Sequence, residues 1–175
     1  MQSKFKTLIT DTINQSILVV TLNRPEVRNA INIDMMQDLL TLWNEITLHN
    51  TALRCVILTG QGDKAFCAGA DLKARSNISL ELWREQHLIL QSAMRAMIDC
   101  PIPIIAAVNG AAFGGGLELA LASDFAYAVD TATFAQSEVK VGLMPGALGT
   151  QNLPRAAGLR RAKELTFTGD TVSYT

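Results

Sequence analysis

Cysteine, histidine and aromatic residues are scarce in this sequence, and their pattern argues against several classes of protein. The chain has three cysteines and two histidines, and 6% of its residues are aromatic. Cys55, Cys67 and Cys100 have neither the spacing of metal ligands nor that of a disulfide framework. The pattern therefore predicts no metal site. It indicates a reducing compartment: the cytoplasm or, for a processed eukaryotic protein, the mitochondrial matrix.

An excess of one charge and a long apolar run are also missing. The net charge is −1, from 15 basic and 16 acidic residues, which argues against nucleic acid as the main partner. No apolar run is long enough to span a bilayer, and no apolar signal region follows Met1. What is present is a 175-residue chain with 49% hydrophobic residues. We expect one domain over residues 1–175 with a sizeable core.

Hydrophobic periodicity predicts an α/β protein. The turn signals at 12–15 predict a hairpin of strands 5–10 and 16–22. Asp34 and Gln37 resemble a capping box at the start of a helix. Segment 61–64 is predicted to be a loop, and 73–79 to be polar and mobile. The other expected elements are strands at 55–58, 104–108 and 124–129, an extended piece at 134–137, and helices at 35–49, about 80–100, 117–122 and 148–157.

Residues 103–149 are the part around which the chain is organised. The strand at 104–108 leads into Gly114, Gly115 and Gly116, and the helix at 117–122 follows. The first N–H groups of a helix lack internal partners and carry the positive end of the helix dipole. The turn therefore suits a developing oxyanion, although a plain strand-to-helix turn explains the glycines equally well.

Two acids accompany this turn. Glu118 is surrounded by apolar residues on its helix, and burial would raise the pKa of its carboxyl toward the range useful for proton transfer. A buried glutamate tied to a backbone donor is the alternative reading. Glu138 follows twenty residues later. Cys67 is not favoured as a nucleophile, because neither histidine lies in a motif.

The motifs together resemble the crotonase family, the enoyl-CoA hydratases and isomerases. They run in the family's order through residues 23–25, 29–32, 66–72, 106–110, 113–120 and 138–146. Segments 70–73 and 116–119 are especially similar to methylglutaconyl-CoA hydratases.

The resemblance implies a fold and an assembly. The fold is α/β, a spiral of β-β-α units with outer helices, here without the family's C-terminal helices. A longer form would assemble as a homotrimer or a dimer of trimers. The implied role is hydration in fatty-acid β-oxidation, with an acyl-CoA as the partner molecule.

The resemblance also implies a role for particular residues. Glu118 and Glu138 are the expected acids, and the N–H groups of Ala70 and Gly115 form the oxyanion hole. No metal or redox cofactor is implied, since coenzyme A belongs to the substrate. The remaining expected substrate-binding positions are Arg28, Ala30, Ala68, Asp71, Leu72 and Gly114.

Two other functions stay open. An isomerase would move a proton along the acyl chain and needs mainly one carboxylate. A silent acyl-CoA-binding or assembly protein would bind without turnover.

The environments of several single residues are also expected from the sequence. Trp83 is a possible acyl-pocket residue, and His87 is expected at the surface or partly buried. Two environments stay open for the Arg28 side chain: contact with a coenzyme phosphate, or solvent. Solvent is the favoured environment for the basic cluster Arg155, Arg160, Arg161 and Lys163.

Overall fold

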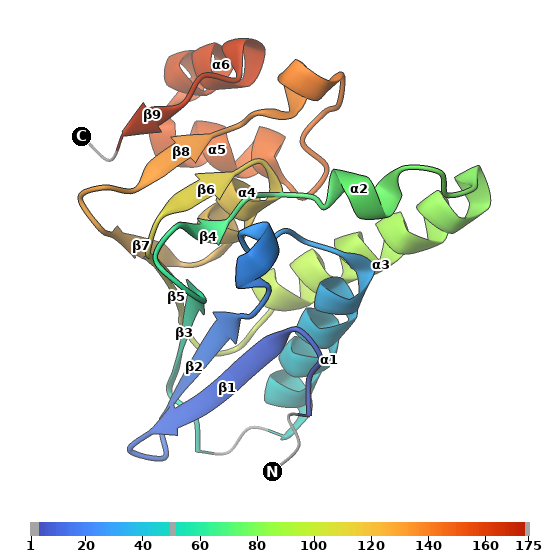
Figure 1. Cartoon of the computed structure of the whole chain (residues 1–175). Helices are drawn as coiled ribbons and strands as arrows, with labels where there is room; N and C mark the ends of the chain where they lie inside the picture. Colours follow the sequence, from blue (N-terminus) through green and yellow to red (C-terminus); the bar gives the residue numbers. More distant parts are fainter. Residues whose placement is uncertain (1–3, 50–51, 174–175) are drawn as a thin grey trace.

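The computed structural model describes residues 4–49 and 52–173, which form two sheets with helices packed around them (Figure 1). The larger sheet has the order β1-β2-β3-β5-β7, and the smaller has the order β4-β6-β8-β9. The strands of the larger sheet are β1 (Leu8–Ile13), β2 (Ile17–Leu22), β3 (Cys55–Gly60), β5 (Ile104–Val108) and β7 (Phe125–Ala128). Those of the smaller sheet are β4 (Ala65–Cys67), β6 (Ala111–Phe113), β8 (Thr133–Ala135) and β9 (Val172–Ser173).

A repeated β-β-α unit builds both sheets. In each repeat the first strand joins the larger sheet and the second joins the smaller one, with parallel pairing between repeats. The expected spiral is therefore confirmed. The first unit differs, because β1 and β2 form the predicted antiparallel hairpin. The helices are η1 (Pro25–Val27), α1 (Ile33–His49), α2 (Leu72–Arg75), α3 (Leu80–Ile98), α4 (Gly115–Ala122), η2 (Glu138–Val141), α5 (Gly149–Ala157) and α6 (Leu159–Thr168).

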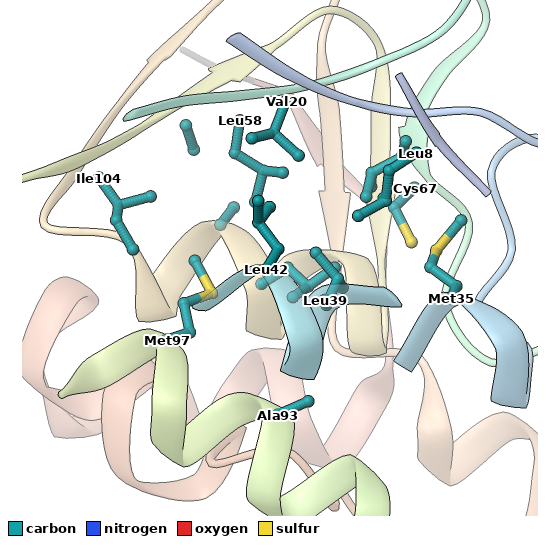
Figure 2. Packing of buried hydrophobic residues seen from close by; sticks show 14 of the residues in the cluster. Leu8, Val20, Met35, Leu39, Leu42, Leu58, Cys67, Ala93, Met97 and Ile104 are labelled. Atoms are coloured by element: carbon teal, nitrogen blue, oxygen red, sulfur yellow. The ribbon is translucent and has the colours of Figure 1, made fainter. Parts of the chain in front are cut away.

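The main core lies between the larger sheet and helices α1 and α3 (Figure 2). Val20, Leu58 and Ile104 point from the sheet toward Leu39 and Met97 on the helices. The expectation that the methionines and tryptophan of the first long helix belong to the core is also confirmed. The residues concerned, Met35, Met36 and Trp43, are at most 1% exposed.

The local predictions were confirmed only in part. The cap of α1 is the side chain of Asn32, which accepts a hydrogen bond from Met35 N at 3.0 Å, so Asp34 lies inside the first turn. The loop at 61–64 is confirmed, but the short strands β4 and β6 were not predicted. Three-residue strands carry too little periodicity to be recognised. Segment 73–79 contains most of α2, which Asp71 caps, and the expected mobility of this segment stays a prediction.

The buried face of α3 was predicted only in part. Ala93 and Met97 lie in the core as expected, whereas Leu82 is exposed. The N-terminal half of α3 extends beyond α1 (Figure 1). Its side chains can therefore contact parts of the molecule other than the main core. Among the described residues, no helix has both the length and the apolar character that a membrane crossing requires.

Candidate active site

A cavity of about 480 Å³ lies where the β-β-α repeats meet. Its walls come from the β4–α2 junction, the first half of α3, the start of α4 and the segment 137–147. Six of the residues expected from the sequence line it: Ala70, Leu72, Gly114, Gly115, Glu118 and Glu138. Positions far apart in the chain are thus brought to one site.

The glycine turn forms the floor of the cavity. Gly114 is the N-cap of α4, with φ of 50°, a region that favours glycine. Its N–H donates to the Ala135 carbonyl at 2.8 Å, which ties the turn to β8. A Cβ at Gly114 would lie 3.2 Å from a carboxylate oxygen of Glu138. The absence of a side chain therefore lets Glu138 approach the start of the helix.

The N–H groups of Ala70 and Gly115 lie next to each other. A Cβ built on Gly115 would lie 3.9 Å from the Ala70 nitrogen. Gly115 is the first residue of α4, so its N–H has no partner inside the helix. Neither N–H donates to any residue that the structure describes. Two adjacent donors of this kind suit an oxygen that gains negative charge.

Glu118 is buried but hydrogen-bonded. The residue is 3% exposed, and its Oε1 accepts hydrogen bonds from the N–H groups of Ala147 and Gly149, each at 2.8 Å. Burial raises the pKa of its carboxyl to about 7, against the opposing effect of the two N–H donors, and the charge of Glu138 adds to the increase. Glu118 is therefore held by backbone donors, as one reading of the sequence expected, and it also faces the cavity. Its role in proton transfer stays a prediction.

Glu138 is held by Gln136. The glutamate begins η2, at the end of the extended stretch expected from the sequence. Gln136 Nε2 donates to both carboxylate oxygens, at 3.0 and 2.9 Å. Gln136 itself is 1% exposed, and its Oε1 is buried without a partner among the described residues. Sequence reasoning missed Gln136; the only available signal was a polar residue two positions before the acid, on the same side of an extended segment.

Four of the expected substrate-binding residues do not line the cavity. Arg28 is exposed, and its backbone has the left-handed conformation, with φ of 54°. Its carbonyl accepts a hydrogen bond from Ala68 N at 3.0 Å. Ala30 is buried, and Ala68 is half-buried. Asp71 forms an ion pair with Arg24 instead. Contact of these four residues with a coenzyme stays a prediction.

The side of the cavity made by α3 carries a stacked ring pair. The rings of Trp83 and His87 are 4.9 Å apart and tilted by 8°, and both residues line the cavity. His87 is half-buried, as expected. Cys67 is fully buried, and burial raises the pKa of its thiol to about 12, in keeping with its rejection as a nucleophile. The basic cluster Arg155, Arg160, Arg161 and Lys163 is exposed on α5 and α6.

The β-β-α spiral places the chain in the crotonase class of folds, and comparison with known proteins gives the same result. An enoyl-CoA hydratase from Bacillus anthracis superposes with a TM-score of 0.92 and 39% identity, over 97% of this chain and 65% of that one. The crotonyl-CoA hydratase of Syntrophomonas wolfei is 41% identical over 162 residues, which cover 91% of this chain and 61% of the relative. The mitochondrial enoyl-CoA hydratase of Pongo abelii is 41% identical over 91% of this chain and 54% of its own length.

A family model described as enoyl-CoA hydratase/isomerase matches residues 12–175. The chain therefore belongs to the enoyl-CoA hydratase/isomerase family. It spans 61% and 54% of the lengths of the two curated relatives given above.

Proposed function

We propose that the protein is an enoyl-CoA hydratase, which adds water reversibly and with syn geometry to the double bond of a 2-enoyl-CoA thioester. One observation carries the proposal: two glutamates, Glu118 and Glu138, face the same cavity as two N–H groups that have no acceptor among the described residues. Similarity to relatives named as hydratases supports it.

The N–H groups of Ala70 and Gly115 bind the thioester oxygen in this proposal. Attack of water at C3 pushes electron density toward that oxygen and creates an enolate. Donors that are already in place stabilise the new charge without reorganisation, and the loss of one such donor typically costs about 100-fold to 1,000-fold in rate.

Glu118 and Glu138 hold the water between them. One carboxylate takes a proton from the water as its oxygen attacks C3, and the other carboxyl delivers a proton to C2. A pKa of about 7 lets Glu118 exist in both protonation states near neutral pH. The residue matching Glu138 in the family is the usual donor to C2, although two interacting carboxyls titrate as a unit. Addition of water transfers no electrons, so the reaction needs no redox cofactor.

Isomerisation is the closest alternative within the family. It needs mainly one carboxylate, because a single group can move a proton along the acyl chain. The presence of two acids in one cavity favours hydration. Product analysis separates the two reactions, since only hydration adds the mass of water.

The first test follows crotonyl-CoA through the loss of enoyl-thioester absorbance. We expect the purified chain to hydrate it, and Glu138→Gln to reduce kcat by about 100-fold or more, because a proton-transfer group is lost. Glu85→Gln, the same change at an exposed position of α3, is the control and should leave the rate unchanged.

Three results would contradict the proposal. Equal rates for the parent and Glu138→Gln would remove Glu138 from the reaction. Thioester binding without turnover would indicate a binding protein. A product without added water would indicate an isomerase.

A further inference from the structure

Arg24 connects two segments that flank the candidate oxyanion hole. Its Nη1 donates to the carbonyl of Ala30 at 2.6 Å and to Oδ2 of Asp71 at 3.0 Å. The side chains of the Arg24–Asp71 pair are 18% and 12% exposed, whereas those of Arg95–Asp99 are 76% and 55% exposed. Exposed pairs contribute little, but a largely desolvated pair holds its geometry, because separating it leaves a buried charge.

The two residues that Arg24 joins are Ala30 and Asp71. Ala30 directly precedes Ile31, Asp71 directly follows Ala70, and Ile31 and Ala70 form an isolated β-bridge. Ile31 N donates to the Gly69 carbonyl at 2.7 Å, and Asp71 N donates to the Ile31 carbonyl at 2.9 Å. The peptide groups before and after Ala70 both face Ile31. Because successive N–H groups of extended chain point to opposite sides, the Ala70 N–H points away from Ile31. Gly115 lies close to it.

Both ends of the Arg24–Asp71 pair are anchored independently. Oδ1 of Asp71 caps α2 by accepting from Ala74 N at 3.1 Å. Asn29, which is completely buried, accepts from Arg24 N at 3.0 Å and donates to the carbonyls of Gln61 and Ala65. The guanidinium therefore spans two fixed pieces of backbone. A substitution that changes the length or charge of the Arg24 side chain must therefore move one of these two backbone segments.

We infer that Arg24 and Asp71 are positioning residues, which set the direction of the Ala70 N–H for the developing oxyanion. The inference rests on the proposed function. Neither residue lines the cavity, so both act through Ala70 without touching the thioester. Motif resemblance suggested Asp71 as a substrate contact; its hydrogen bonds favour this indirect role.

The test compares Arg24→Met, Arg24→Lys and Asp71→Asn. Arg95→Met is the matched control, since it makes the same change in an exposed ion pair on α3. We expect Arg24→Met and Asp71→Asn to lower kcat for crotonyl-CoA by about tenfold to a hundredfold, as a misplaced catalytic group does. KM should stay within about threefold of the parent value, because the lost interaction is made mainly in the transition state. Arg24→Lys should recover part of the rate.

A second readout reports the oxyanion hole directly. The absorption band of bound 4-dimethylaminocinnamoyl-CoA moves to longer wavelength when its carbonyl is polarised. We expect a smaller shift with Arg24→Met than with the parent, an intermediate shift with Arg24→Lys, and the full shift with Arg95→Met. A role confined to holding the loop together would lower the amount of folded protein without changing the shift per bound ligand.

The inference is overturned if Arg24→Met keeps both kcat and the full band shift, or if it raises KM alone. Should Arg24→Met fail to fold by circular dichroism, Arg24→Lys and Asp71→Asn decide by the same two criteria. A parent chain that neither hydrates crotonyl-CoA nor shifts the band would overturn the proposed function itself. A parent that does both, with unaffected variants, would overturn only the role of the ion pair.

Discussion

At the scale of single residues, Glu118 shows how burial and hydrogen bonding compete. Two N–H donors favour its ionised form, yet the loss of contact with water has the larger effect and raises the pKa to about 7. The folded protein therefore contains a carboxyl whose pKa lies close to neutral pH. The same property makes Glu118 unfavourable to stability when it is ionised.

This gives a prediction on stability against pH. In the unfolded chain the carboxyl has its ordinary pKa of 4.5, and in the folded chain about 7. Between these values the folded state binds more protons, so the free energy of unfolding falls as the pH rises, by about 3 kcal/mol in total. Glu118→Gln keeps an oxygen for the N–H groups of Ala147 and Gly149 and should remove this slope. Urea unfolding at about pH 5 and about pH 8 measures it.

The control for this measurement is Glu85→Gln, which removes an exposed carboxylate and should retain the slope of the parent. If the free energy of unfolding falls equally in the parent and in Glu118→Gln between the two pH values, the prediction of a raised pKa for Glu118 is wrong.

At the scale of elements, the site depends on how closely α4 approaches β4. Gly116 lies in the first turn of α4, and a Cβ there would collide with the carbonyl oxygen of Cys67 on β4. Cys67 is completely buried, so its backbone has little room to move. This contact sets the distance from the helix that carries Glu118 to the strand that leads to Ala70.

We therefore expect Gly116→Ala to destabilise the protein by about 3 kcal/mol or more through overpacking. Gly146→Ala is the matched control: a Cβ there would meet only a side-chain atom of His87, at 3.4 Å, an ordinary contact. Its effect should stay within about 1 kcal/mol. The midpoints of urea denaturation give both values, and similar losses for the two variants would contradict the close packing of α4 on β4.

The elements themselves were predictable to different degrees. β3 and β5 were recognised because each is an apolar run bounded by turn residues, and α1 because its apolar residues recur at helical spacing. β4 and β6 pair with each other and lead into Ala70 and Gly114 of the site, but nothing in three residues distinguishes a strand from a loop.

At the scale of the whole molecule, the cavity depends on segments that the chain brings together from several repeats. Its outer wall includes Leu143 and Met144, which are 50% and 80% exposed. Exposed apolar side chains beside a cavity gain most when an apolar ligand covers them. The trimer or dimer of trimers expected from the sequence stays a prediction.

Ligand binding should therefore protect this wall. We expect butyryl-CoA, which has no double bond to hydrate, to raise the free energy of unfolding by about 2.7 kcal/mol at a hundred times its Kd. Hydrogen exchange should slow in residues 139–147, and free coenzyme A should not slow it, because the proposed function places the acyl group in the cavity. Equal protection by both ligands would place the acyl group elsewhere.

The sequence by itself determined the family, and the family resemblance predicted the β-β-α spiral and four candidate site residues, Glu118, Glu138, Ala70 and Gly115, which the structure brings into one cavity. Motifs and hydrophobic periodicity involve residues close together in the sequence, so they can be recognised before the fold is known. Only the tertiary structure decided that Arg24 pairs with Asp71, 47 residues away, and that α3 brings Trp83 and His87 to the cavity. It also decided the pKa of Glu118, because burial, long-range hydrogen bonds and shared cavities exist only after distant segments have packed together.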